Sequence, residues 1–330
     1  MTRQLLLLFL LPIISLQGTE RRNFNRENIV PWCVVPFDAS KRSPEERAKM
    51  LVRLGLKRSA YDWRAQHVPE FEEEILQYKK HGIEFFAFWN IHEKAFELFQ
   101  KHKIHPQIWK TLSSPKSGNQ EEKIRSAKEA MVPLAKRTAE IGCKLGLYNH
   151  GGWGGEPENL VAVCKALRAE GHEHLGIVYN WHHGHGRIEE WKQDLELMLP
   201  YLHCLNLNGM NTGAQPKILE LGKGEHERTM LKVVLESEYN GPVGILDHQN
   251  ELDAEESLQA NLTGLDSLLG KINSLETKAE TLPFPHNRLR HFYRTQAQSF
   301  IGQIDRNYSR TLKPFPGLDG GGWGHWGQNP

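Results

Sequence analysis

Residues 144–183 read KLGLYNHGGWGGEPENLVAVCKALRAEGHEHLGIVYNWHH, and the fold class is predicted from the pattern of these residues. Two short apolar runs, Lys144–Asn149 and Leu175–Asn180, have the length of β-strands, and residues 157–169 between them have the apolar spacing of a helix. A strand, a helix and a second strand in this order predict two parallel strands joined by a right-handed crossover.

The same alternation extends along the chain in both directions. Eight strand–helix units within residues 29–273 match the size of a (β/α)8 TIM barrel, which is the predicted fold. The alternative is an open, doubly wound sheet, and it is disfavoured because residues 36–40, after the first run, hold no glycine. The predicted strands are Ile29–Phe37, Arg58–Trp63, Ile83–Trp89, His105–Trp109, Lys144–Asn149, Leu175–Asn180, Leu202–Asn208 and Val243–Asp247. The other predicted helices cover residues 44–54, 71–82, 120–141, 187–199, 226–238 and 253–270.

The two ends of the chain differ from the predicted barrel. Residues 1–18 combine Arg3, the apolar run Leu5–Leu16 and a small residue at the end, which is typical of a signal peptide. The alternative is an uncleaved anchor, but the run is short for a membrane span of about 20 residues. We therefore expect an exported protein, secreted or periplasmic, without a membrane span in the mature chain. Residues 274–330 predict a linker, a helix over 286–304 and a flexible Gly-rich tail, whose tryptophans would alternatively stack on a partner or a sugar.

Charge and cysteine content exclude some classes of function. Lys plus Arg (41) nearly balances Asp plus Glu (40), and a net charge of +1 argues against nucleic-acid binding. The four cysteines, Cys33, Cys143, Cys164 and Cys204, form no Cys-x-x-Cys pair, so a thiolate zinc site has no support. Export would permit disulfides, but each cysteine lies in or beside a predicted strand or helix, which favours buried thiols.

Polar and aromatic side chains gather where the predicted strands end, which is where parallel barrels carry their functional residues. Five tryptophans, several asparagines and several histidines occur there. Amides both donate to and accept from hydroxyls, and indole faces pack on apolar C–H faces, so we expect a sugar or polyol ligand. For any single tryptophan, packing at the barrel mouth is the alternative. The candidate ligand-binding residues are Arg64, Trp89, Trp109, Asn149, Trp153, Asn180, Asn206, Asn208 and His248.

Some of these strand ends also carry candidates for acid–base chemistry. Histidine suits proton transfer because its ordinary pKa lies near neutral pH, and His150 alternatively has a hydrogen-bonded structural role. Asp62 alternatively pairs with Arg64. Imidazoles that lie close together bind transition metals, and a solvated histidine-rich loop is the alternative. The catalytic candidates are His150, His183, Asp62 and Asp247, and the metal candidates are His182, His183 and Asp247.

Five segments of the predicted barrel resemble the xylose isomerase-like TIM-barrel superfamily, often labelled sugar phosphate isomerase/epimerase. The resemblance runs from about residue 29 to residue 272 and implies a TIM barrel that acts on a sugar as an isomerase or epimerase. The segments are Tyr148–Gly151 (Glu-Asn-His-Gly in the superfamily), Asn180–His183 (Asp-x-x-His), Asn206–Asn208 (His-x-Lys), Leu221–Glu225 (a Pro-Gly-x-Gly loop) and Tyr239–Leu246 (the approach to the eighth strand).

The resemblance breaks at the positions that hold a divalent metal in many members. Where those members have Glu, Asp, His and Glu, this chain has Tyr148, Asn180, Asn206 and, about where the last Glu would fall, Asp247. Neutral amides are poor ligands for a divalent cation without carboxylates to neutralise it. The sequence therefore leaves open whether the chain binds a divalent metal, and the superfamily's metal-assisted proton transfer is not carried over to this chain.

Two functions from different classes follow. The first is an exported isomerase, epimerase or lyase that acts on a sugar or polyol derivative, which predicts a pocket with a histidine facing a carboxylate. The second is a non-catalytic carbohydrate-binding barrel with an open cleft lined by tryptophans. The resemblance favours the enzyme. A nuclease, also found in the superfamily, is disfavoured by the missing metal ligands and the neutral charge.

Overall fold

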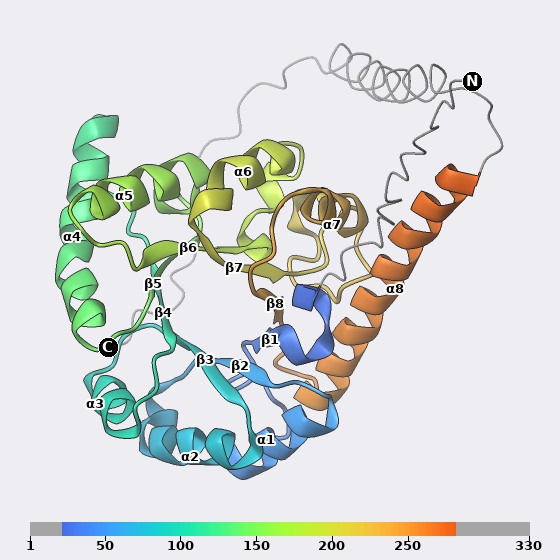
Figure 1. The fold of residues 1–330 in the computed structure, drawn as a ribbon, viewed down its shortest axis with the longest axis horizontal. Coiled ribbons are helices and arrows are strands. Elements are labelled where there is room, and N and C mark those ends of the chain that lie inside the picture. The colour runs from blue at the N-terminus through green and yellow to red at the C-terminus, as the bar shows by residue number, and fades with distance from the viewer. Residues whose placement is uncertain (1–21, 282–330) are drawn as a thin grey trace, which may run out of the picture. The chain divides into compact units, whose positions relative to one another are not determined.

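The computed structural model describes residues 22–281, and these residues form a barrel of parallel strands inside a ring of helices (Figure 1). The strand order is β1-β8-β7-β6-β5-β4-β3-β2, and every hydrogen-bonded pair is parallel. The predicted (β/α)8 TIM barrel is confirmed. The strands are β1 Ile29–Trp32, β2 Arg58–Tyr61, β3 Glu84–Trp89, β4 Gln107–Thr111, β5 Leu145–Tyr148, β6 Leu175–Asn180, β7 Leu202–Leu207 and β8 Val243–Leu246. The helices are α1 Pro44–Arg53, α2 Phe71–His81, α3 Glu93–His102, α4 Gln120–Glu140, α5 Pro157–Ala169, α6 Trp191–Met198, α7 Glu227–Glu236 and α8 Ala254–Thr281.

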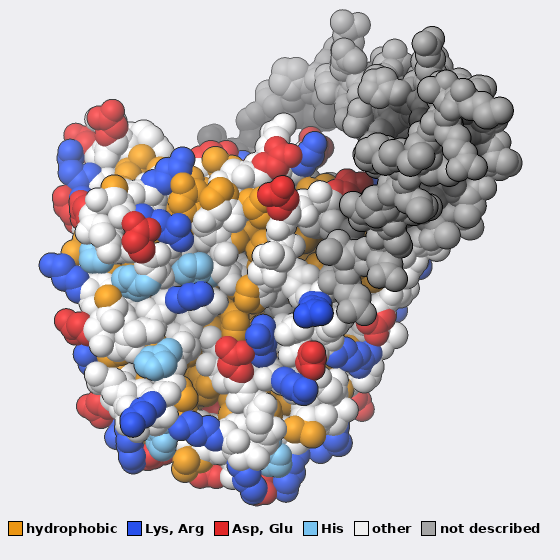
Figure 2. All heavy atoms as spheres, viewed as in Figure 1, with side chains coloured by type: hydrophobic (Ala, Val, Ile, Leu, Met, Phe, Trp, Pro, Cys, Tyr) orange, Lys and Arg blue, Asp and Glu red, His pale blue; other side chains and the backbone are white. Residues whose placement is uncertain are grey.

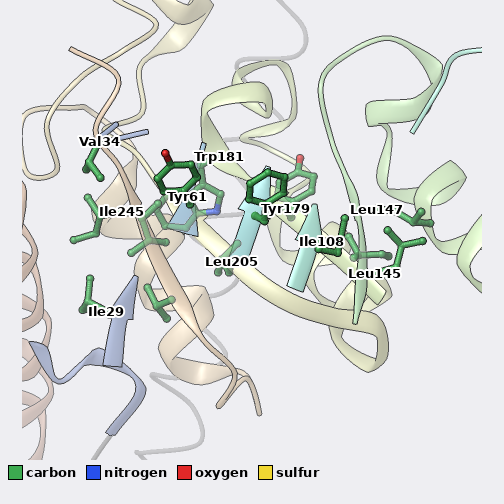
Figure 3. Packing of buried hydrophobic residues seen from close by; sticks show 14 of the residues in the cluster. Ile29, Val34, Tyr61, Ile108, Leu145, Leu147, Tyr179, Trp181, Leu205 and Ile245 are labelled. Atoms are coloured by element: carbon green, nitrogen blue, oxygen red, sulfur yellow. The ribbon is translucent and has the colours of Figure 1, made fainter. Parts of the chain in front are cut away.

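The strands divide the buried side chains between two hydrophobic clusters because successive side chains point to opposite faces of a sheet. In β6, Ile177 and Tyr179 pack outward against the helices, whereas Val178 between them points into the barrel. Figure 3 shows part of the outer cluster, with Leu205 and Ile245 from neighbouring strands in the same layer. The inner cluster is rich in aromatic rings, so the barrel is filled rather than hollow below its mouth.

Side chains at the helix ends fix where several helices begin. Ser43 accepts from the backbone N–H of Glu46, and the Glu46 carboxylate accepts from the backbone N–H of Ser43, which is a capping box before α1. Asn119 and Glu122 repeat this arrangement before α4. Helix α3, which begins after the capping His92, was not among the predicted helices.

Glycines inside the barrel leave room for large neighbours. A Cβ on Gly244 of β8 would lie 1.8 Å from Oδ1 of Asn206 on β7. A Cβ on Gly176 of β6 would lie 2.3 Å from the imidazole of His203. These two positions therefore need glycine so that the neighbouring strands can carry polar side chains inward.

The barrel has one seam, between β1 and β2, where the described strands share no ladder of hydrogen bonds. The side of β1 away from the seam pairs with β8 from Ile29 to Trp32. Beyond it, Arg42 donates to Asp38 at 2.8 Å and to Asp253 at 2.7 Å, which ties the loop after β1 to the segment before α8.

The described residues set limits on the other predictions. Helix α8 continues past residue 273 to Thr281, where the sequence predicted a polar linker. The predicted signal peptide, the helix over 286–304 and the Gly-rich tail lie outside the described residues. None of the described helices is long and apolar enough to cross a membrane.

All four cysteines are free and buried, as predicted. Figure 2 shows acidic and basic side chains interspersed over the viewed face, as the near-zero net charge implies.

Candidate functional site

A pocket of about 140 Å³ lies at the C-terminal ends of the strands, where barrels of this architecture carry their active sites. Its walls combine aromatic rings with imidazoles, and a single carboxylate, Asp62, lines it among the described residues. A larger groove, about 600 Å³, lies between α8 and the loop after β7, but no histidine, aromatic ring or cysteine lines it. The residues that line the smaller pocket are Trp32, Cys33, Phe37, Asp62, Arg64, Trp89, Tyr148, His150, His182, His183, Leu246 and His248.

Asp62 follows β2 and is only 2% exposed. Its Oδ1 is buried without a hydrogen-bond partner, and its Oδ2 lies 3.9 Å from Nη1 of Arg64. Burial raises the pKa of Asp62 to about 7, although the Arg64 guanidinium acts in the opposite direction. A carboxyl group with a pKa near neutral and an unpartnered oxygen is suited to accept and return a proton.

The pocket also contains Trp32 and Cys33, which sequence reasoning missed. Strand β1 ends at Trp32, and Cys33 adopts a left-handed backbone conformation with φ of 65°. The sequence had predicted one strand over residues 29–37, which placed its end at Phe37; the unusual length of that run was the available signal. Burial raises the pKa of the Cys33 thiol well above its usual range, and the nearby Asp62 carboxylate raises it further, so this thiol stays protonated.

Three imidazoles form a contiguous cluster after β5 and β6. The ring centroids of His150 and His183 lie 4.4 Å apart, and those of His182 and His183 lie 4.5 Å apart. His248, after β8, lies 6.0 Å from His182. Burial lowers the pKa of all four histidines, to about 3 for His182 and about 4 for His248, and the Lys217 ammonium lowers them further. The imidazoles are therefore neutral at pH 7, and each has one N–H to donate.

Lys217 is brought to this cluster by the loop after β7. The carbonyl oxygen of Lys217 accepts from Nδ2 of Asn208 at 3.1 Å and lies 3.0 Å from Nε2 of His185. The second cation at the site is Arg64, whose guanidinium lies 5.2 Å from the ring centroid of Phe37. No sequence pattern pointed to Lys217, because its position depends on contacts with residues elsewhere in the chain.

Tyr148 and Asn180 occupy two of the positions where the resembled superfamily has metal ligands, and here they bond to each other. Nδ2 of Asn180 donates to the Tyr148 hydroxyl at 2.8 Å, and Oδ1 of Asn180 accepts from the backbone N–H of His182 at 3.1 Å. The Asn149 side chain accepts from the Asn180 N–H at 2.7 Å and donates to the Asn180 carbonyl at 3.0 Å. Asn149 and Asn180, predicted to bind ligand, therefore use these groups to join the ends of β5 and β6.

Asp247 does not line the pocket, although it was predicted beside Asp62 as a catalytic and metal-binding residue. Oγ of Ser257 on α8 donates to Oδ1 of Asp247. Successive side chains point to opposite faces, which explains the difference. Leu246 points into the barrel, so the next residue, Asp247, points outward. Tyr61 points outward, so the next residue, Asp62, points into the barrel. Burial raises the pKa of Asp247 to about 7 as well, so it resembles Asp62 in burial and pKa but not in place.

Four other predicted ligand-binding residues also lie outside the lining. Trp109 and Trp153 each donate their indole N–H to a glutamine side chain at 2.9 Å, Trp109 within the barrel interior and Trp153 against the start of α4. Asn206 is buried with an unpartnered Nδ2. Asn208 donates to the backbone of its own loop. Arg64, Trp89 and His248 are the predicted ligand-binding residues that do line the pocket.

The residues at the superfamily's metal positions do not fit a divalent cation. Tyr148 and Asn180 are neutral and bonded to each other, and Asp247 faces α8. Among residues 22–274, no group of three or more His, Cys, Asp and Glu side chains is arranged to hold a metal ion, and the candidates His182 and His183 form no such group. The pocket offers one titratable carboxyl group and several neutral hydrogen-bond donors instead.

No protein-family model and no curated protein sequence matches the chain. Solved structures with a xylose isomerase-like TIM-barrel fold do match it. The 3-keto-D-glucoside 4-epimerase YcjR from E. coli is 14% identical, with a TM-score of 0.54 over 74% of this chain and 99% of that one. The IolI protein, solved with a bound zinc atom, is 12% identical, with a TM-score of 0.59 over 74% and 98%. A xylose isomerase domain protein from Salmonella typhimurium is 12% identical, with a TM-score of 0.56 over 73% and 98%. At these identities the likeness shows the fold.

Proposed function

From this xylose isomerase-like barrel and its pocket, we propose that the chain is a sugar isomerase or epimerase that moves a proton on a carbon next to a carbonyl group. The observation that carries the proposal is Asp62, a buried carboxyl group with an unpartnered oxygen and a pKa of about 7 in a pocket lined by neutral imidazoles. Environments that move a carboxyl pKa to neutral are typical of catalytic acids and bases.

The pocket lining supports a small carbohydrate as the ligand. The rings of Trp32, Trp89 and Phe37 offer apolar faces for C–H groups, and the imidazoles and Arg64 offer donors for hydroxyl and carbonyl oxygens. A cavity of about 150 Å³ holds a benzene molecule, so the pocket of about 140 Å³ accommodates the reacting end of a sugar. One structural neighbour is named as an epimerase of a keto sugar, which supports this substrate class.

In the proposed reaction, Asp62 takes the proton from the carbon next to the carbonyl group. The electron pair of that C–H bond forms a C=C bond, and the carbonyl π electrons move to oxygen and give an enolate. A neutral imidazole of His150 or His183 lies within the same pocket to hold the oxygen or to return a proton. Return of the proton to the opposite face of the same carbon gives an epimer. Its return to the former carbonyl carbon gives an isomer, provided that the hydroxyl proton of the neighbouring carbon moves to the enolate oxygen and leaves the new carbonyl group behind.

The test is exchange of carbon-bound hydrogen for solvent deuterium, followed by proton NMR with a panel of ketoses and 3-keto-glucosides. We expect exchange with at least one compound, and a loss of at least 100-fold in the Asp62→Asn variant. Asp247→Asn is the matched control, because it removes a second buried carboxyl group that lies outside the pocket. Equal loss in both variants, or no exchange with any compound, would contradict the proposal.

The second candidate is a carbohydrate-binding protein without catalysis. It is favoured by the two tryptophans in the pocket, Trp32 and Trp89, together with the neutral residues at the superfamily's metal positions. Quenching of indole fluorescence by a sugar that undergoes no exchange would identify this outcome.

We also propose that the chain is exported, secreted or periplasmic, on the sequence of residues 1–18 alone. Mass spectrometry of the protein recovered outside the cytoplasm would then find a mature chain that starts near Thr19. Recovery of a chain that keeps residues 1–18 would refute cleavage.

A further inference from the structure

The hydroxyl oxygen of Tyr148 accepts a hydrogen bond, whereas the hydroxyl proton has no acceptor among the described residues. Tyr148 is 3% exposed and lines the pocket, and Nδ2 of Asn180 donates to its oxygen at 2.8 Å. The orientation of this amide is fixed by its other end, because Oδ1 of Asn180 accepts from the backbone N–H of His182. Among the described residues no group accepts the hydroxyl proton in a hydrogen bond, so that proton is available to a ligand.

A second donor lies beside it. The indole N–H of Trp32 is buried without a hydrogen-bond partner, and Trp32 is 3% exposed and lines the same pocket. The ring centroids of Trp32 and Tyr148 lie 6.2 Å apart. Buried donors without partners are costly, so two of them in one pocket indicate that a ligand oxygen satisfies them.

We propose, resting on the function proposed above, that Tyr148 and Trp32 donate hydrogen bonds to the oxygen that gains charge when the substrate enolises. Asn180 is a positioning residue that directs the Tyr148 proton into the pocket. Asp62 takes the carbon-bound proton, the electron pair shifts to the carbonyl oxygen, and Tyr148 keeps its own proton throughout. Neutral donors at the ends of β1 and β5 would then stabilise the charge that a metal ion would otherwise stabilise.

The environment of Tyr148 fits a donor that does not ionise. Burial raises the pKa of Tyr148 and the nearby Asp62 carboxylate acts in the same direction, whereas the N–H groups of Asn180 and Trp32 that face its oxygen act in the opposite direction. Preorganised donors aimed at developing negative charge are worth about 100- to 1,000-fold in rate for one donor. The site thereby combines a carboxyl base with neutral acids, a pairing that known enolising enzymes use.

The experiment measures how well the full chain recognises an enolate-like charge. Glycolohydroxamate mimics an enediolate, and glycolamide has the same skeleton without the acidic N–OH group. Their dissociation constants are measured by calorimetry at pH 8 after treatment with EDTA, beside the deuterium exchange assay. We expect the unmodified chain to prefer the hydroxamate by at least 10-fold.

The variants test whether the Tyr148 proton must point into the pocket, and a control variant tests for a general effect on folding. Tyr148→Phe removes the donor and is expected to weaken glycolohydroxamate binding more than glycolamide binding, so the preference is lost. Asn180→Asp keeps the shape but gives the Tyr148 hydroxyl an acceptor, which turns its proton away from the pocket and should also remove the preference. Trp32→Phe should reduce it. The matched control is Tyr179→Phe, because Tyr179 is buried on the outward side of β6 against Trp191 and does not line the pocket.

The outcomes distinguish this inference from the proposed function. A full preference in Tyr148→Phe and Asn180→Asp, with deuterium exchange in the unmodified chain, overturns the inference and leaves the proposed function standing. A preference that disappears on EDTA treatment of the unmodified chain also overturns it, since a metal would then hold the oxygen. If the unmodified chain binds neither compound and exchanges no substrate, the proposed function itself is wrong.

Discussion

Asp62→Asn should make the protein more stable at the same time as it removes activity. The carboxyl pKa of about 7 in the folded chain stands about three units above the ordinary value of 3.8, and each unit corresponds to about 1.4 kcal/mol. Because the folded pKa is the higher one, ionisation of Asp62 destabilises the fold. This cost is absent below about pH 4, grows as the pH rises towards 7, and is constant at about 4 kcal/mol above that.

Urea unfolding of the unmodified chain and of Asp62→Asn at pH 5 and pH 8 measures this cost. The variant should be more stable by about 2 kcal/mol at pH 5 and by about 4 kcal/mol at pH 8, since the amide never ionises. Asp247→Asn should show a similar pH dependence, because Asp247 is also buried with a raised pKa of about 7. The reasoning would be refuted if Asp62→Asn raised the free energy of unfolding by the same amount at both pH values.

Three further predictions concern the pH profile, the barrel interior and the helix layer. The value of kcat/KM should fall about tenfold per pH unit below 7 as Asp62 is protonated, with no additional change from His182 or His248 between pH 5 and 7, and a pH–rate profile checks this. Gly244→Ala should lower stability by about 1–3 kcal/mol because its Cβ would overlap Oδ1 of Asn206, and an unchanged melting temperature would show that the strands relax freely. Arg47→Met should cost about 3–5 kcal/mol because Arg47 and Glu74 form a buried ion pair at 2.9 Å, and the double Met variant should recover most of that loss in urea unfolding.

The alternation of strands and helices was predictable because it depends on local periodicity. Each strand of this barrel is buried on both faces, so its apolar run stands out against the amphipathic helices on either side. Two elements were exceptions. Helix α3 was not predicted, and β1 ends at Trp32 and not at Phe37, because the chain stays apolar after the backbone of Cys33 turns into the left-handed region. That one boundary concealed Trp32 and Cys33 from the predicted site.

The candidate site was predictable as a region and less so as a set of side chains. Asp62 and Asp247 both follow a strand, so the sequence pattern gives them the same place. They differ because the preceding residue points outward at Tyr61 and inward at Leu246. As a result Asp62 lines the pocket and Asp247 faces α8. Lys217 had no local signal at all, since long-range contacts of its loop carry it to the histidines.

The seam between β1 and β2 also affects which ligands the protein can admit. Trp32 ends one of these strands, with Cys33 directly after it, and Asp62 follows the other, so the two sides of the pocket that carry the base and a donor are not joined by strand hydrogen bonds. The wall between β1 and β2 is therefore held by side-chain packing and not by strand hydrogen bonds. The width of the pocket on this side is set by the side chains of Trp32, Cys33 and Asp62, so substitutions there change the size of ligand that fits without disturbing a strand ladder.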